Sequence, residues 1–149
     1  MQVRYTALGL GVLFLVLGLA GFVPAFVSLP HIPAEAPIDA PNILNSGYGY
    51  LFGVFPTNYL HNAVHLVVGI LGIAAATSYG GSKTYLQGFT IAYALIVVMG
   101  LIPGANTMFG KMPIYGNNVW FNALATGVAA YYGFIKPTED KEITSATGI

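Results

Sequence analysis

Four long apolar stretches dominate the chain and are separated by segments rich in glycine, proline or polar residues. The first runs from Tyr5 to Val27 and the second from Thr57 to Tyr79. At 1.5 Å per residue each reaches about 34 Å, which exceeds a hydrocarbon core of about 30 Å. The third, Tyr85 to Ile102, and the fourth, Val119 to Ile135, reach about 25–27 Å, so their ends are expected in the interface. The pattern predicts an all-α membrane protein, with four transmembrane helices in an antiparallel bundle that forms one domain over residues 1–149.

The composition agrees with a bilayer environment. Hydrophobic residues make up 56% of the 149 residues and charged residues 7%, against about 25% charged in soluble domains. The mean hydropathy is +0.71 and the formal net charge is zero, so no positive excess is available for nucleic acid. The chain has no cysteine, which excludes disulfides, thiolate zinc sites and iron–sulfur clusters. No apolar stretch contains Asp, Glu, Lys or Arg, and no nucleotide-binding or hydrolase motif is present, so an enzyme is not expected.

The positions of the basic residues predict the orientation. With four spans, Arg4, Lys83, Lys136 and Lys141 fall on one side of the membrane and Lys111 falls on the other. Lysine and arginine are enriched in cytoplasmic segments of membrane proteins. Both termini are therefore predicted to be cytoplasmic, in a bacterial inner membrane or a thylakoid-type membrane.

The connections between the stretches are unequal. Residues 28–56 form a long outer loop in two parts. Residues 30–41 are rich in proline and predict an extended chain, whereas residues 46–56 are aromatic and glycine-rich. This second part predicts a segment that lies in the interface or re-enters over the bundle. Residues 137–149 predict a frayed polar tail, and residues 79–83, which contain a Gly-Gly-Ser run, predict a tight turn.

Glycine and other small residues recur along the stretches. The ending Gly21-Phe-Val-Pro24 is similar to Gly100-Leu-Ile-Pro103, and two tandem helical hairpins are one open alternative for the topology. Small residues at spacings of three, four and seven predict close helix packing, with a groove for a flat pigment or quinone as the alternative. These residues are Ala7, Gly11, Gly18 and Ala25 in the first stretch, Gly69, Gly72 and Ala76 in the second, and Thr126, Ala129 and Gly133 in the fourth.

Six amide and imidazole side chains gather at the starts of the second and fourth stretches. They are Asn58, His61, Asn62, His65, Asn118 and Asn122. His61 and His65 are four residues apart and therefore share one helix face. An unsatisfied polar group in hydrocarbon costs several kcal/mol. We therefore expect these side chains to hydrogen-bond across the bundle and hold the outer loop against it.

Two ligand-binding interpretations stay open beside this structural one. His61 and His65, together with Glu35, Asp39 or His31, are candidate ligands for a divalent cation, because an i, i+4 histidine pair suits zinc or copper. One of the two histidines could instead serve as the axial ligand of a haem or chlorophyll. A bis-histidine haem that bridges two helices is disfavoured, since only the second stretch carries histidine at membrane depth.

The run from Phe52 to Gly72 resembles the signature of a bacterial family of small four-helix membrane proteins, which is known only as a domain of unknown function. Its most specific element is the H-N-x-x-H-x-x-x-G run at His61–Gly69. The resemblance implies the four-helix membrane fold and assigns no activity. In the fourth helix the family pattern has Asp and then His where this chain has Asn118 and Asn122. If the family uses those residues as ligands, this chain lacks two of them.

Together these observations predict a non-catalytic integral membrane protein that acts by contact. It is expected to be an accessory or assembly subunit of a larger membrane complex, or a homo-oligomer. The alternative is a membrane protein that binds haem, chlorophyll or a metal through His61 and His65.

Overall fold

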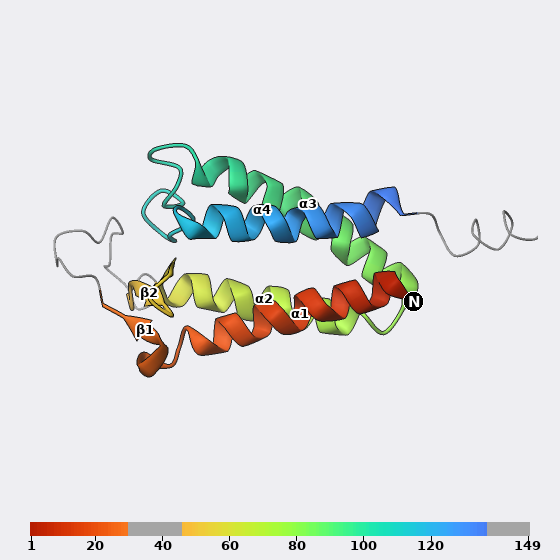
Figure 1. Cartoon of the computed structure of the whole chain (residues 1–149), viewed down its shortest axis with the longest axis horizontal. Helices are drawn as coiled ribbons and strands as arrows, with labels where there is room; N and C mark the ends of the chain where they lie inside the picture. The colour runs from red at the N-terminus through yellow and green to blue at the C-terminus, as the bar shows by residue number, and fades with distance from the viewer. Residues whose placement is uncertain (30–45, 137–149) are drawn as a thin grey trace, which may run out of the picture.

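A computed structural model describes residues 1–29 and 46–136 of the chain. Four helices account for most of these residues, and their connections carry three short strands (Figure 1). The elements, in chain order, are α1 (Gln2–Ala20), the 3-10 turn η1 (Pro24–Phe26), β1 (Val27–Ser28), β2 (Gly49–Leu51), β3 (Phe55–Thr57), α2 (Tyr59–Ala75), α3 (Tyr79–Gly100), α4 (Asn117–Ala130) and the π-helical turn η3 (Tyr131–Ile135).

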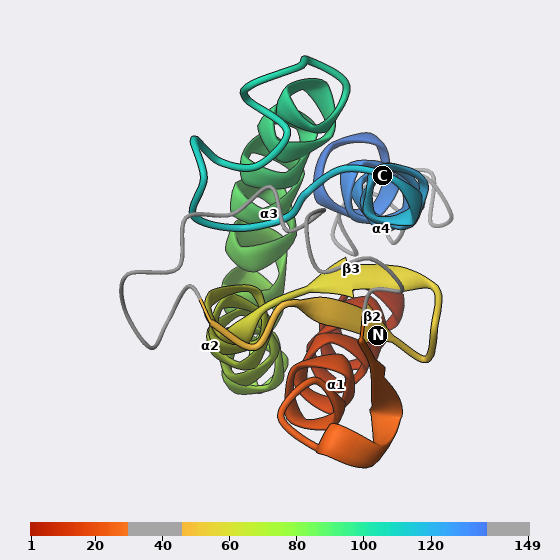
Figure 2. The ribbon, with the colours of Figure 1, turned by 90° about the vertical axis from the view of Figure 1, so that its left-hand side faces the viewer.

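The helices form two antiparallel pairs, in which α1 lies along α2 and α3 lies along α4 (Figures 1 and 2). Consecutive helices therefore pair, as the two-hairpin alternative predicts. The pairs meet around Phe14 of α1, which is fully buried. Its ring centroid lies 5.2 Å from those of Phe89 and Tyr93 on α3, in edge-to-face contacts. Such contacts are the arrangement that aromatic rings prefer.

Glycines allow α1 and α2 to approach closely. A Cβ atom added at Gly11 would lie 2.6 Å from the backbone nitrogen of Ile73, and one at Gly18 would lie 2.8 Å from the backbone oxygen of Asn62. On the facing helix, a Cβ at Gly69 would overlap the backbone of Leu15. No larger residue fits at these positions, so the prediction of close packing through small residues is confirmed for this pair.

The expectation of an all-α fold is wrong in one respect, because three short strands form an antiparallel sheet in the order β1-β2-β3. Val27 pairs with Leu51, and Tyr50 pairs with Pro56. We call residues 49–57, which comprise β2, its turn and β3, the outer hairpin. It lies across the end of the bundle at which α2 and α4 begin (Figure 2). We call this the hairpin end.

The predicted turn at residues 79–83 is also wrong. The chain turns at residues 76–78, and Gly80 and Gly81 lie in the first turn of α3. The Ser78 side chain caps this helix by accepting a hydrogen bond of 3.0 Å from the backbone nitrogen of Gly81. A serine cap satisfies one of the free N–H groups of the first turn, and it offsets part of the cost of two glycines in a helix.

The helix bounds differ from the predicted spans by several residues. α1 ends at Ala20 rather than near Val27, because Pro24 follows closely, and α3 begins earlier than expected, at Tyr79.

Among the described residues, only α1 is both long and apolar enough to cross a membrane, and α2 is apolar but has 17 residues. The predicted extended chain at 30–41 and the frayed tail at 137–149 lie outside the described residues.

Candidate functional site

The polar cluster begins at Asn58, the residue before α2. Its side-chain oxygen accepts a hydrogen bond of 2.8 Å from the backbone nitrogen of His61 and so caps the helix. Its amide nitrogen donates to the backbone oxygen of Lys111, at 2.8 Å. One buried side chain therefore starts α2 and also holds the connection between α3 and α4.

Asn62 links three segments at the hairpin end. Its amide nitrogen donates to the backbone oxygen of Gly21 at 2.7 Å, and its side-chain oxygen accepts from the Thr57 hydroxyl at 2.5 Å. The side chain is 1% exposed. It satisfies a carbonyl at the end of α1, where the helix leaves its last carbonyls without helical partners.

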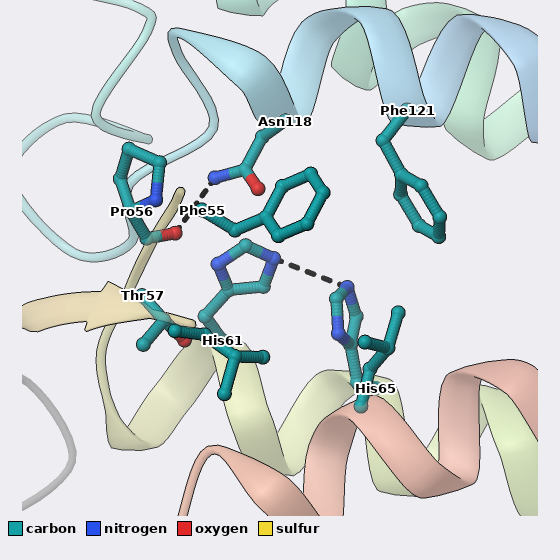
Figure 3. A pocket seen from close by; sticks show the side chains of 9 residues that line it. Phe55, Pro56, Thr57, His61, His65, Asn118 and Phe121 are labelled. Carbon is teal, nitrogen blue, oxygen red and sulfur yellow. Dashed lines mark hydrogen bonds between the residues drawn. The ribbon is translucent and has the colours of Figure 1, made fainter. Parts of the chain in front are cut away.

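His61 and His65 contact each other on the inner face of α2 (Figure 3). Their Nε2 atoms are 3.1 Å apart, and their ring centroids are 4.4 Å apart. His65 also makes an edge contact with Phe14, at 4.9 Å between ring centroids. Nδ1 of His61 is the one fully enclosed side-chain nitrogen or oxygen in residues 1–29 and 46–136 that makes no hydrogen bond. The imidazoles are thus each other's polar partners, inside the bundle.

Asn118 joins the outer hairpin to α4. Its amide nitrogen donates to the backbone oxygen of Pro56 at 2.7 Å and to that of Pro113 at 3.0 Å. The neighbouring residue, Asn117, donates to the backbone oxygen of Val54 at 3.1 Å. The outer hairpin therefore lies over the end of the bundle and is held there by amides. Residues 46–56 thus fold over the bundle, as one of the two expected placements requires.

Asn122 is buried one turn further along α4, and it is 2% exposed. Its side chain makes no hydrogen bond to any residue in the described ranges, so it is not the direct partner of His65. It lines a small cavity with His61, His65, Tyr93 and Met112. The structure thus brings both histidines and Asn122 to one cavity.

Two small cavities lie on either side of the histidine pair. One is the cavity lined by Asn122, and the other lies under the outer hairpin, between Phe55, Asn118 and Phe121 (Figure 3). In each cavity, the volume within which the centre of a water molecule can lie is about 10 Å³. This is about the space that one water molecule needs. Neither cavity is large enough for a tetrapyrrole ring in this arrangement.

Sequence reasoning missed Tyr93 and Met112. Tyr93 lies in the middle of the third apolar stretch. A hydroxyl group at that depth needs a polar partner, so the sequence could have indicated this residue. Met112 lies in the segment between α3 and α4, where no pattern in the sequence indicates burial. Both are buried, at 4% and 5% exposure.

The other predicted metal ligands, Glu35, Asp39 and His31, lie outside the described residues. Within those residues no group of three His, Cys, Asp or Glu side chains is placed to hold a metal ion. The described part of the chain contains no Asp or Glu at all. A carboxylate-assisted zinc site is therefore not formed by the helices themselves.

Comparison with known proteins gives a family and no activity. Neither a curated protein nor a solved structure matches the chain. The profile of a protein family matches residues 4–135, a range that includes nearly all of the helical bundle and the whole polar cluster. The chain belongs to this family, which is described as a domain of unknown function, DUF4383.

Proposed function

We propose that the chain is a non-catalytic integral membrane protein whose four helices cross the bilayer. Each helix presents large apolar side chains outward, and soluble monomers rarely expose such continuous apolar surface. These exposed residues include Leu13, Val16 and Leu19 on α1, Val67, Ile70 and Leu71 on α2, Ile91, Leu95 and Val98 on α3, and Trp120, Leu124 and Val128 on α4. Lipid is the environment that accepts this surface on all four helices.

The distribution of charge supports the same placement. Arg4, Lys83 and Lys136 lie at the end of the bundle opposite the outer hairpin, and Lys111 lies at the hairpin end. With basic residues enriched on the cytoplasmic side, both termini face the cytoplasm of a bacterial inner or thylakoid-type membrane.

The absence of cysteine from the chain allows a direct test of this topology. Lys111→Cys and Thr77→Cys place single thiols at exposed positions at opposite ends of the bundle. In intact cells, a membrane-impermeant maleimide is expected to label Lys111→Cys and to label Thr77→Cys only after permeabilisation. Equal labelling of both thiols in intact cells would contradict the four crossings.

We propose further that the protein works by helix–helix association, as an accessory or assembly subunit or as a homo-oligomer. The observation that carries this proposal is an exposed stripe of small residues on α3, at a spacing of four: Gly80, Thr84, Gly88 and Ala92. A Cβ atom at Gly80 or Gly88 would meet no atom within 4 Å. In membranes, small residues at this spacing let a second helix approach closely.

The test is Gly88→Leu, with Gly127→Leu as its matched control. Both glycines face open space on their helices, so neither change should disturb the fold. Gly88→Leu fills the small-residue stripe and is expected to weaken association at least tenfold, as measured by cross-linking in native membranes and by native mass in mild detergent. Gly127→Leu is expected to leave association unchanged. A monomeric wild type in both assays, or equal association of both variants, would refute the proposal.

The second candidate function is binding of a metal ion by His61 and His65, or of a haem or chlorophyll if the bundle opens to admit the ring, since neither cavity holds a tetrapyrrole as it stands. It is favoured by the placement of two imidazoles against each other in the interior, one with an unbonded Nδ1. A pigment predicts visible absorbance in the purified protein, and a metal predicts a stoichiometric content, each lost in His65→Ala. A colourless, metal-free protein that cannot be loaded would exclude this function.

A further inference from the structure

The cavity between α2, α3 and α4 has an unusual lining for the interior of an apolar bundle. Two imidazoles, His61 and His65, face an amide, Asn122, a phenol, Tyr93, and a thioether, Met112. Neither the amide of Asn122 nor the hydroxyl of Tyr93 makes a hydrogen bond to a residue of the described ranges. Both residues line the same cavity as the histidines, so a species bound there would lie beside them.

The two histidines are spaced for a shared ligand. Their Nε2 atoms are 3.1 Å apart. For a metal ion at the usual imidazole distance of about 2.0–2.1 Å, this separation corresponds to an N–metal–N angle of about 95–102°. The separation is therefore compatible with one coordination sphere, once an ion replaces the direct contact between the two nitrogens.

Nδ1 of His61 makes no hydrogen bond to the described residues, so this nitrogen can carry the ring proton while Nε2 binds a metal. A ligating histidine donates its other ring N–H to a carboxylate or a backbone carbonyl. Pro56 and His61 line the cavity under the outer hairpin together, and the carbonyl oxygen of Pro56, which accepts from Asn118, can accept a second hydrogen bond. Moving the His61 proton to Nδ1 frees Nε2 for the metal and leaves the charge of the ring unchanged.

Met112 is the candidate for a third ligand, and its thioether and the charge of the site distinguish among metals. Met112 is held near the histidines because its neighbour Lys111 is bonded through its carbonyl to Asn58. Thioether ligands favour copper(I), and imidazole is compatible with it. The described residues include no carboxylate to balance a divalent ion. Because the Born cost of burying an ion rises with the square of its charge, a monovalent ion is favoured strongly over a divalent one.

We propose that His61, His65 and Met112 bind one copper(I) ion in this cavity, with Asn122 and Tyr93 around it. This inference deepens the second candidate function above, and it rests on the proposed membrane placement, which supplies the low-dielectric surroundings. It differs from the divalent site predicted with Glu35 and Asp39, since neither carboxylate takes part.

The test is anaerobic titration of the full-length protein in detergent with copper(I), in competition with bicinchoninate. One equivalent is expected to bind, and X-ray absorption is expected to show one sulfur and two imidazole nitrogens around the metal. Met112→Leu conserves side-chain volume and should weaken copper(I) binding at least tenfold and remove the sulfur signal. His65→Ala should abolish binding, and silver(I) should raise the thermal stability of the wild type but not that of His65→Ala.

The matched controls are Met99→Leu, which changes a methionine of α3 outside the cavity, and His31→Ala. Both are expected to bind copper(I) as the wild type does. Zinc(II) is expected to bind at least a hundredfold more weakly than copper(I).

Unchanged binding in Met112→Leu, loss of binding in His31→Ala, or zinc(II) binding as tight as that of copper(I) would overturn the proposal. If Lys111→Cys and Thr77→Cys confirm the topology and copper(I) does not bind, the copper inference alone fails. If those thiols contradict the topology, the membrane proposal fails whatever the metal result.

Discussion

Asn62 and Gly21 offer a sharp test of how the hairpin end is held together. Gly21 has an ordinary right-handed backbone conformation, with φ of −65°, so alanine is compatible with its dihedral angles. A Cβ atom there would nevertheless overlap the side chain of Asn62, lying 2.5 Å from its amide nitrogen and closer still to its oxygen. Gly21 is therefore needed to make room for Asn62 rather than to form a turn.

The magnitudes follow from these contacts. Asn62→Ala removes the hydrogen bonds to Gly21 and Thr57, and each such bond contributes about 0.6–1.5 kcal/mol. The expected loss in the free energy of unfolding is therefore about 1–3 kcal/mol. Gly21→Ala overpacks the site and is expected to cost about 1–3 kcal/mol. In the Asn62→Ala background the overlapping carboxamide is gone, so Gly21→Ala should cost nothing and can gain about 0.5 kcal/mol from reduced backbone entropy.

The assay is a double-mutant cycle, with unfolding in mixed micelles followed by circular dichroism. We expect a coupling energy of about 1–3 kcal/mol between the two positions, within the range measured for contacting residues. Gly9→Ala is the control, because a Cβ there meets no atom within 4 Å, and it is expected to be neutral or stabilising. Additive effects of Gly21→Ala and Asn62→Ala would refute the steric explanation.

Two other predictions concern the α1–α2 interface and the tyrosines of the outer loop. Gly69→Ala places a Cβ against the backbone of Leu15 and is expected to lower the free energy of unfolding by about 1–3 kcal/mol. A stability equal to that of Gly9→Ala would contradict this packing. Burial and hydrogen bonds with the hydroxyls of Tyr115 and Tyr50 raise the pKa of Tyr48 above its usual value. The contribution of Tyr48 to stability is therefore fully present below the unfolded pKa of about 10 and is lost as the pH rises further toward the folded pKa. Tyr48→Phe should lower the free energy of unfolding by about 1 kcal/mol at pH 8 and by less at pH 11, and a difference that grows with pH would contradict the assigned shift.

The sequence predicts the helical part of the fold well, because each helix coincides with a long apolar run. It also indicates that the Asn and His residues are buried polar groups, since amides and imidazoles at that depth need partners. The strands escape prediction because β1 has two residues and β2 and β3 have three each. A period of two cannot be recognised over so few positions.

The candidate site is harder to predict for a different reason. The two histidines are close in sequence, and helix geometry places them together. Tyr93 and Met112, by contrast, reach the cavity from α3 and from the segment that precedes α4. Their proximity depends on how the second helix pair packs on the first, which no local pattern encodes.

The pairing of consecutive helices has a consequence for the order in which the protein matures during synthesis. The first hairpin contains both histidines and can close on itself, because Gly21, Asn62 and the glycine contacts all lie within residues 1–75. Tyr93, Met112 and Asn122 leave the ribosome later, so until then the imidazoles lack part of their enclosure. A nascent chain halted between the two hairpins would therefore present its histidines to chaperones, metal donors or lipid.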